Sequence, residues 1–101
     1  MENPKYTKAK QELIEKGITS MRVFGNSMTP LIRSGSMLTF KKCEKYAIDD
    51  IVFCRLAGRY IDAHKITAKN DQRGYLISNN HGHDNGWTHN IFGKVIWIEH
   101  P

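Results

Sequence analysis

Two short segments of the sequence hold residues that together could perform nucleophilic catalysis. Ser27 lies in the segment 25–30, where Gly25 permits a tight turn and Pro30 restricts the backbone that follows. A serine hydroxyl becomes a strong nucleophile only when a base takes its proton and fixed donors hold the oxyanion. His64 can be that base, because an unperturbed imidazole titrates near pH 6.5. Taken alone, the first motif is more typical of an ordinary turn and the second of a half-buried histidine, so neither carries the prediction by itself.

Lys65 follows His64 directly and is the alternative base. Side chains alternate between the two faces of a strand, so only one of these neighbours can serve a given site. A lysine needs extensive desolvation before it is unprotonated at neutral pH. We therefore expect His64 to be the base.

Three further histidines and an acid share one segment rich in Asn, Gly and His: His81, His83, His89 and Asp84. Imidazole and carboxylate groups can bind zinc or another borderline metal. The spacing His-x-His-x5-His matches no established metal motif, so we expect neither a metal nor another cofactor. Trp87 in the same segment is either a substrate contact or a cover for the edge of the core.

One helix is expected at the N-terminal end, from Pro4 to Lys16. Asn3 can cap it, Pro4 suits the first helical position, and Gly17 is a natural stop. A single helix excludes a helix-turn-helix DNA-binding module. Apolar positions at helical spacing predict its buried face: Tyr6, Ala9, Leu13 and Ile14.

The remaining chain alternates short β-prone segments with turns. The expected strands lie at 18–24, 37–40, within 48–56, at 59–67, 75–78 and 91–99, with a hairpin turn at Ala57-Gly58. Segment 79–90 has no periodicity and is expected to be a long surface loop. The pattern predicts a mainly β fold, a small coiled sheet or partly open barrel with one N-terminal helix. We expect a single domain overall, with a helical segment at 1–17 and a β domain at 18–101.

Charge, cysteine content and the lack of apolar runs bear on nucleic-acid binding, on disulfide or zinc sites and on location. The net charge is +5, but the lysines are scattered, which is more typical of a solvated surface than of a nucleic-acid stripe. Nucleic acid is therefore a possible but not a favoured partner. Cys43 and Cys54 match no disulfide or zinc pattern, and Cys54 lies in an apolar run that predicts burial. The N-terminus lacks the apolar stretch of a signal peptide, and no membrane-spanning run follows, so a cytoplasmic location is expected.

The order of the motifs resembles the signal-peptidase/LexA superfamily of serine peptidases. Residues 22–30 look like the strand that leads into its nucleophile motif, Gly-x-Ser-Met-x-Pro, and residues 62–66 match its base motif. Residues 31–37 and 47–52 are similar to two further family segments, with Ser36 in place of the usual acid and Asp49 in place of a glycine. Residues 92–95 resemble the closing strand. The resemblance therefore runs from about residue 22 to residue 98.

The resemblance implies that Ser27 is the nucleophile, that its backbone N–H helps to form the oxyanion hole, and that His64 is the base. Bacterial signal peptidases and LexA-type proteins carry lysine at the base position, whereas archaeal and eukaryotic-reticulum signal peptidases carry histidine. In that second branch an aspartate in a later loop assists the histidine. Asp84 is the candidate here and Asp62 is the alternative, and a Ser27–His64 dyad without a third residue also stays open. The family's Gly-Asp pair in this loop is replaced by Asn79-Asn80.

The resemblance also implies an extended peptide substrate that adds as a strand beside the Ser27 segment, with small P1 and P3 side chains. Asn26, Met28 and Pro30 flank Ser27 and are the predicted substrate-binding residues. Only 26 residues precede Ser27, and they contain neither an anchor nor a DNA-binding domain. We therefore expect a soluble peptidase that cuts a protein or peptide in trans, with an unspecified oligomeric state. The alternative is an inactive module that binds a partner protein or nucleic acid, which the departures at Ser36, Asp49 and residues 79–80 favour.

Overall fold

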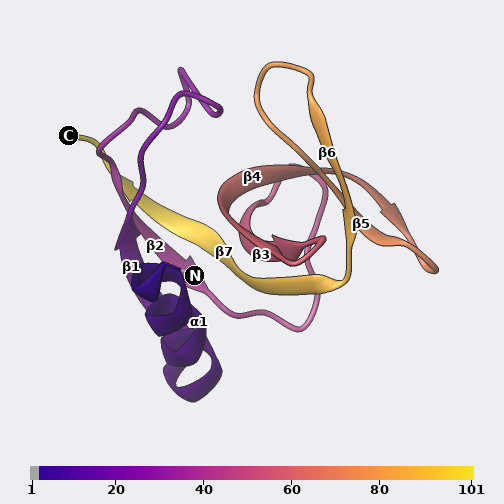
Figure 1. Cartoon of the computed structure of the whole chain (residues 1–101), viewed down its shortest axis with the longest axis horizontal. Coiled ribbons are helices and arrows are strands. Elements are labelled where there is room, and N and C mark those ends of the chain that lie inside the picture. Colours follow the sequence, from indigo (N-terminus) through magenta and orange to yellow (C-terminus); the bar gives the residue numbers. More distant parts are fainter. Residues whose placement is uncertain (1–2) are drawn as a thin grey trace.

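One helix and seven strands make up the described part of the fold (Figure 1). The computed structural model describes residues 3–101. The elements in chain order are α1 (Pro4–Lys16), β1 (Ile18–Arg22), β2 (Met37–Lys41), β3 (Ile51–Leu56), β4 (Arg59–Asn70), β5 (Gly74–Ser78), β6 (Asp84–Thr88) and β7 (Asn90–Glu99).

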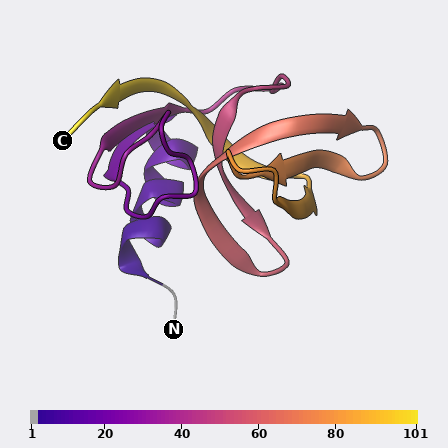
Figure 2. The ribbon, with the colours of Figure 1, turned by 90° about the horizontal axis from the view of Figure 1, so that it is seen from above.

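The strands form one antiparallel sheet in the order β1-β2-β7-β3-β4-β5-β6. β1 and β6 are its two edges, so the sheet is open. Register shifts interrupt most of the pairings, and bulges of this kind increase the local twist. Figure 2 shows the consequence: α1, β1 and β2 lie to one side, β3 to β6 coil on the other, and β7 runs between them. The prediction of a mainly β fold with a small coiled sheet and one N-terminal helix is confirmed.

The helix begins and ends where its capping residues predict. The Asn3 side chain accepts a 3.0 Å hydrogen bond from Lys5 N, and Gly17 closes the helix in the left-handed conformation with φ 77°. Ala9 and Leu13 are buried against the sheet. Ile14, however, is 54% exposed, so the expectation that it belongs to the buried face was wrong. The helix packs against β1 and β7, and its Tyr6 ring also contacts the rings of Phe53 and Tyr60.

The turn between β3 and β4 has the expected hairpin geometry. Ala57 and Gly58 both have positive φ, 50° and 79°, and Leu56 pairs with Arg59 across them. Two consecutive left-handed residues match the right-handed twist of the flanking strands. The hairpin sets the register of β4, and with it the position of His64.

The segment expected to be one long loop contains a strand instead. β6 pairs with β5, with Gly86 opposite Ile77 and Trp87 opposite Leu76. Gly86 has φ 136° and lies against the Leu56 side chain, where a Cβ would approach to 3.4 Å. The strand thus depends on pairing and close packing with distant residues rather than on local alternation. At the other edge, β1 ends at Arg22, two residues earlier than expected.

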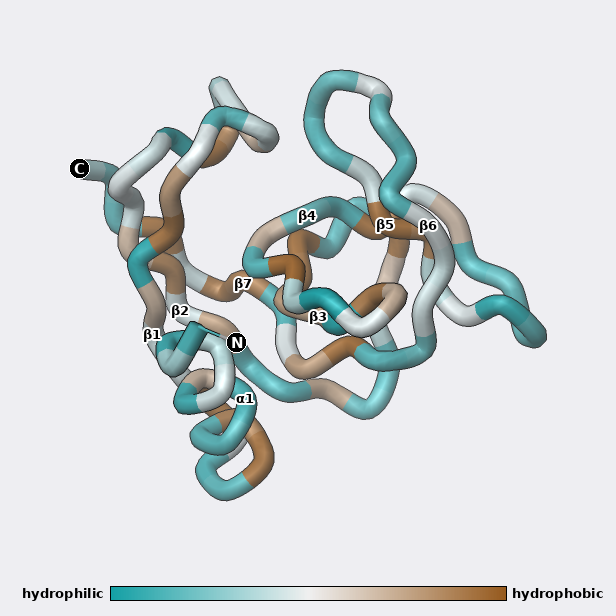
Figure 3. Tube along the Cα trace, viewed as in Figure 1, coloured by the Kyte–Doolittle hydropathy of each residue, from teal (hydrophilic) through white to brown (hydrophobic). Residues whose placement is uncertain are grey.

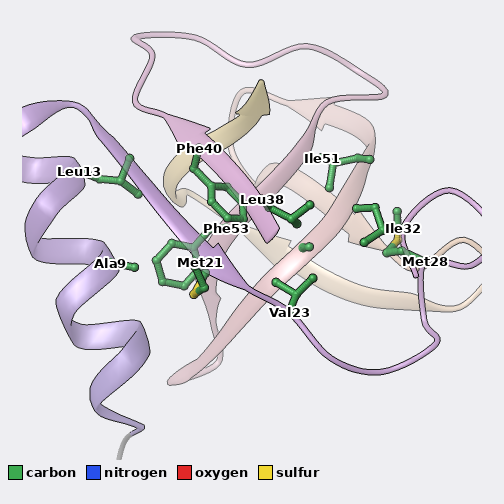
Figure 4. Close-up of a cluster of buried hydrophobic side chains, with 11 residues drawn as sticks. Ala9, Leu13, Met21, Val23, Met28, Ile32, Leu38, Phe40, Ile51 and Phe53 are labelled. Atoms are coloured by element: carbon green, nitrogen blue, oxygen red, sulfur yellow. The ribbon is translucent and has the colours of Figure 1, made fainter. Parts of the chain in front are cut away.

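Two groups of buried side chains flank β3, whose first four residues are all buried. The first extends from α1 along the sheet to the β1–β2 loop and includes Leu13, Phe40 and Phe53 (Figure 4). The second lies on the opposite side and contains Tyr46, Val52, Cys54, Ile66 and Ile77. Figure 3 shows the apolar segments on the strands and hydrophilic loops around them. The first group also holds Met28 and Ile32, which follow Ser27 in the chain.

Both cysteines are free thiols. Cys54 is fully buried, as predicted, and burial, with a smaller contribution from Asp62, raises the pKa of its thiol to about 12. A thiol that stays protonated is a poor nucleophile and metal ligand. Within residues 3–101, no helix has the length and apolar character needed to cross a membrane.

Candidate active site

The loop between β1 and β2 presents Ser27 at the surface. Ser27 itself is exposed, whereas the next residue, Met28, is only 3% exposed. The base of the loop is closed by two backbone hydrogen bonds, Val23 N to Ser36 O at 2.9 Å and Gly35 N to Val23 O at 2.8 Å. The loop thus holds a solvent-facing hydroxyl on a turn that is anchored in the core.

Both departures from the family pattern in this half of the chain have a structural explanation. Ser36, which replaces the acid, is fully buried and its hydroxyl donates to Arg33 O at 2.7 Å. Asp49, which stands in a glycine's place, has φ 78°, a conformation that glycine adopts most easily. Its backbone N–H donates to Ile66 O at 2.8 Å. Neither hydrogen bond involves Ser27 or His64.

The structure brings Ser27 and His64 together from segments 37 residues apart. His64 Nε2 lies 2.9 Å from Ser27 Oγ, within the range of about 2.6–3.2 Å in which a base can take a proton. His64 is half-buried and lies on β4, paired with Val52 of β3. A hydroxyl and an imidazole at this distance can carry out acyl transfer.

Lys65 turns away from this pair, as strand alternation predicts. Its ammonium group donates to Asn80 Oδ1 at 3.3 Å. The lysine thus contacts the β5–β6 loop instead of Ser27. Of the two candidate bases, His64 is the one beside the hydroxyl.

Burial lowers the pKa of His64 below its ordinary value of 6.5. The main cause is loss of solvation of the imidazolium form; the Asp62 carboxylate opposes it, and His83 adds to it. The lowered pKa favours the neutral ring over the imidazolium. The other nitrogen, Nδ1, is buried and has no hydrogen-bond partner in the protein.

The two candidate acids occupy different places. Asp84 Oδ1 accepts a 2.7 Å hydrogen bond from Ser78 Oγ, which also lies 2.7 Å from Thr67 Oγ1. Within residues 3–101, no hydrogen bond joins Asp84 to His64. Asp62 accepts a 3.2 Å hydrogen bond from the Tyr6 hydroxyl on α1. Burial and the nearby Asp62 carboxylate raise the pKa of Tyr6 to about 12, so its hydroxyl remains a donor.

The β5–β6 loop holds the β1–β2 loop, which carries Ser27, through hydrogen bonds that the sequence did not predict. Asn80 N donates to Ser27 O at 2.8 Å, and its side-chain amide donates to Thr29 O at 3.1 Å. His81 Nε2 lies 2.9 Å from Asn26 O. Figure 1 shows the two loops at the same end of the sheet. Asn80, which replaces a family acid, is therefore a structural contact of the Ser27 turn.

A comparison with protein-family models gives a match to the model described as Peptidase S24-like over residues 2–96. The chain belongs to the Peptidase S24-like family. The match confirms the predicted superfamily and includes both Ser27 and His64. The comparison with curated proteins found no match.

In this S24-like chain the histidines of segment 81–89 have separate surroundings. His81 contacts Asn26 O in the β1–β2 loop, whereas His89 Nε2 lies 2.8 Å from Gln72 O. Over residues 3–101, no group of three or more His, Cys, Asp or Glu side chains is arranged to hold a metal ion.

Trp87 is half-buried and its ring lies 5.7 Å from the Arg73 guanidinium.

The predicted substrate-binding residues differ in exposure. Asn26 and Pro30 are exposed, whereas the Met28 side chain is part of the core. Beside Ser27 lies a small depression of about 10 Å³. The depression joins the β1–β2 loop to β4. Its lining combines the polar residues Ser27 and Asp62 with apolar residues, which are Val23, Phe24, Met28, Ile32 and Ala63.

Proposed function

We propose that this S24-like chain is a serine peptidase that cleaves a protein or peptide in trans, with Ser27 as nucleophile and His64 as base. The observation that carries the proposal is the 2.9 Å separation of Ser27 Oγ and His64 Nε2. The depressed pKa of His64 supports it, because a neutral imidazole can accept a proton at neutral pH. The cytoplasmic location stays a prediction of the sequence.

The reaction follows from the two groups. Ser27 Oγ attacks the carbonyl carbon of the scissile peptide bond while its proton moves to His64 Nε2. The resulting imidazolium gives that proton to the leaving nitrogen, the C–N bond breaks, and an acyl ester remains on Ser27. A water molecule then attacks the ester, with His64 again taking the proton. As the ester bond between the acyl carbon and Ser27 Oγ breaks, the His64 imidazolium returns its proton to Oγ, which releases the carboxylic acid product and restores the Ser27 hydroxyl.

The peptide group between Asn26 and Ser27 is the proposed source of the oxyanion donor. Its carbonyl oxygen, Asn26 O, accepts from Thr29 N at 3.2 Å, from Thr29 Oγ1 at 2.9 Å and from His81 Nε2 at 2.9 Å. Donors on the carbonyl fix the peptide plane and polarise the N–H at its other end. We propose that the Ser27 N–H, held in this way, stabilises the negative oxygen of the tetrahedral intermediate.

The depression beside Ser27 supports a small P1 residue. Its volume, about 10 Å³, is close to that of a single water-sized group. We propose that an extended substrate lies along the segment 23–26, with an alanine-sized side chain in the depression. Met28 then forms part of its floor, and the exposed Asn26 and Pro30 border the substrate.

We propose that Asp84 assists the site indirectly, by holding a neighbouring loop in place, and not by contact with His64. Its hydrogen bond to Ser78 Oγ holds the end of β5, from which the loop contacting Ser27 departs. An Asp84→Asn change would therefore act on the position of that loop. The proton transfer itself is assigned to Ser27 and His64.

Digestion of a randomised peptide library, with products identified by mass spectrometry, tests this function. We expect cleavage after alanine, glycine or serine by the wild-type protein, and none by Ser27→Ala or His64→Ala. Ser20→Ala, which changes an exposed serine on β1, is the matched control and should cleave like the wild type. Equal cleavage by Ser27→Ala would contradict the assignment. Binding of peptides without cleavage by the folded wild-type protein would favour the inactive module instead.

A further inference from the structure

A cavity lies beside His64 that does not include Ser27 in its lining. It has a volume of about 370 Å³ and lies between the β3–β4 hairpin and β6. Its wall includes Leu56, Tyr60, Ile61, Asp62, His64 and Asn85. Because Nε2 of His64 contacts Ser27, the second nitrogen, Nδ1, is the one left for interactions elsewhere.

Two buried side-chain polar atoms in residues 3–101 have no hydrogen-bond partner in the protein: His64 Nδ1 and Asn85 Oδ1. Both residues line the same cavity. Unpaired buried polar atoms are rare in native proteins because each forfeits the solvation it had in water. Their occurrence in one cavity therefore indicates that they share a hydrogen-bonding function.

The chemistry of the two atoms is complementary. An imidazole that accepts the Ser27 proton at Nε2 carries its own hydrogen on Nδ1, so Nδ1 is a donor. The amide oxygen of Asn85 is an acceptor only. A water molecule between them would accept from Nδ1–H and donate to Oδ1. The cavity that both residues line has a volume of about 370 Å³, which is more than one water needs.

The position of Asn85 is set by its neighbours on β6. Asp84 before it is hydrogen-bonded to Ser78, and Gly86 after it packs against Leu56. The backbone of Asn85 is thus fixed on both sides. A fixed acceptor that lines the same cavity as Nδ1 selects, once a water joins the two atoms, one tautomer and one orientation of the ring, which is the function of the third residue in a serine-peptidase triad.

We propose that Asn85 is the positioning residue of His64, joined to Nδ1 through one water molecule in this cavity. The inference rests on the proposed Ser27–His64 pair and adds a neutral amide as its third member. It separates two functions: Asn85 orients the ring, and the Asp62 carboxylate supplies the charge that stabilises the imidazolium. The other titratable or charged groups facing His64 or this cavity are Arg59, Tyr60 and His83.

The test combines nuclear magnetic resonance of the His64 ring with the rate at which a phosphonate probe labels Ser27. In the wild type we expect the hydrogen on Nδ1. Asn85→Ala should mix the two tautomers and slow labelling about five- to tenfold, the effect of one neutral hydrogen bond. Asn85→Asp nearly keeps the shape of the side chain and its acceptor oxygen, so this variant should hold the Nδ1–H tautomer as the wild type does. Its labelling midpoint should move to higher pH, because a carboxylate favours the imidazolium. Asn90→Ala, an exposed asparagine on β7, is the control.

A purely structural asparagine would give a different result. Both Asn85 variants would then lower the unfolding temperature and the labelling rate together, with the His64 tautomer and pH midpoint unchanged, and the proposal would be overturned. It would also fail if Asn85→Ala labelled at the wild-type rate with the Nδ1–H tautomer intact. If the wild type does not label at all, the proposed function fails, whereas the tautomer measurement still decides the Asn85 inference.

Discussion

His81 Nε2 and Asn26 O lie 2.9 Å apart, although 55 residues separate them in the chain. A carbonyl oxygen only accepts, so His81 carries its hydrogen on Nε2. The contact therefore ties the β5–β6 loop to the peptide group that contributes the Ser27 N–H. It gives the second loop a direct influence on the proposed oxyanion site.

Replacing His81 by phenylalanine should slow labelling of Ser27 several-fold. The substitution keeps a ring but removes the donor to Asn26 O, so the peptide plane is held less firmly. His89→Phe, a histidine whose Nε2 contacts Gln72 O instead, should leave the rate unchanged. The labelling rates of both variants would be measured by following the intact mass of the protein over time. Equal labelling rates for His81→Phe and the wild type would show that His81 does not help to position the Ser27 N–H.

The pH dependence of labelling should follow the neutral form of His64. Because burial lowers the pKa of His64 from 6.5, the rate should rise with pH and reach half its maximum below pH 6.5. The Asp62 carboxylate raises this pKa, so Asp62→Asn should move the midpoint to still lower pH. Asp71→Asn, at an exposed turn, is the control. A midpoint that moves upward in Asp62→Asn would contradict the electrostatic account.

The same titration should appear in the stability of the protein. The unfolded chain binds a proton at His64 near pH 6.5, whereas the folded chain does so only at lower pH. Between these two values the unfolded state holds more protons, so the free energy of unfolding should increase as pH rises through this window. Urea unfolding across this range would measure it, and His64→Gln should remove this contribution. An unchanged pH slope in His64→Gln would argue against it.

Met28 should couple stability to activity. Its side chain is 3% exposed and packs in the core directly after Ser27. Met28→Ala should lower the free energy of unfolding by about 2–5 kcal/mol, and labelling should slow because the turn loses its anchor. Met28→Leu, close in volume, should cost less than about 1.5 kcal/mol and retain most of the rate. Urea unfolding and labelling of the two variants would check this. Loss of stability in Met28→Ala without any change in labelling would show that the anchor does not position Ser27.

Local signals predicted the elements that depend on local geometry. Asn3, Pro4 and Gly17 mark the helix because capping involves only neighbouring residues, and Ala57-Gly58 marks the hairpin for the same reason. Ser27 and His64 could be paired in advance because their motifs occur in a known order. The 2.9 Å separation of Ser27 Oγ and His64 Nε2 could be obtained only from the structure.

Elements and contacts that depend on distant residues were not predictable in this way. β6 exists through its pairing with β5 and the contact of Gly86 with Leu56. Ile14 falls on the expected helical face, yet it is exposed while Ala9 and Leu13 are buried, because helical spacing alone does not show which positions the sheet covers. His81 and Asn85 lie in a segment without periodicity, and their functions depend on what the fold places beside them.

The most direct test of the central claim is labelling with a phosphonate probe at neutral pH, read by intact mass and peptide mapping. The account predicts one adduct per wild-type chain, located on Ser27, and no adduct on Ser27→Ala or His64→Ala. All three proteins must first be shown to be folded by circular dichroism. Labelling of Ser27 that continues at the wild-type rate in His64→Ala would contradict the claim that His64 activates this hydroxyl.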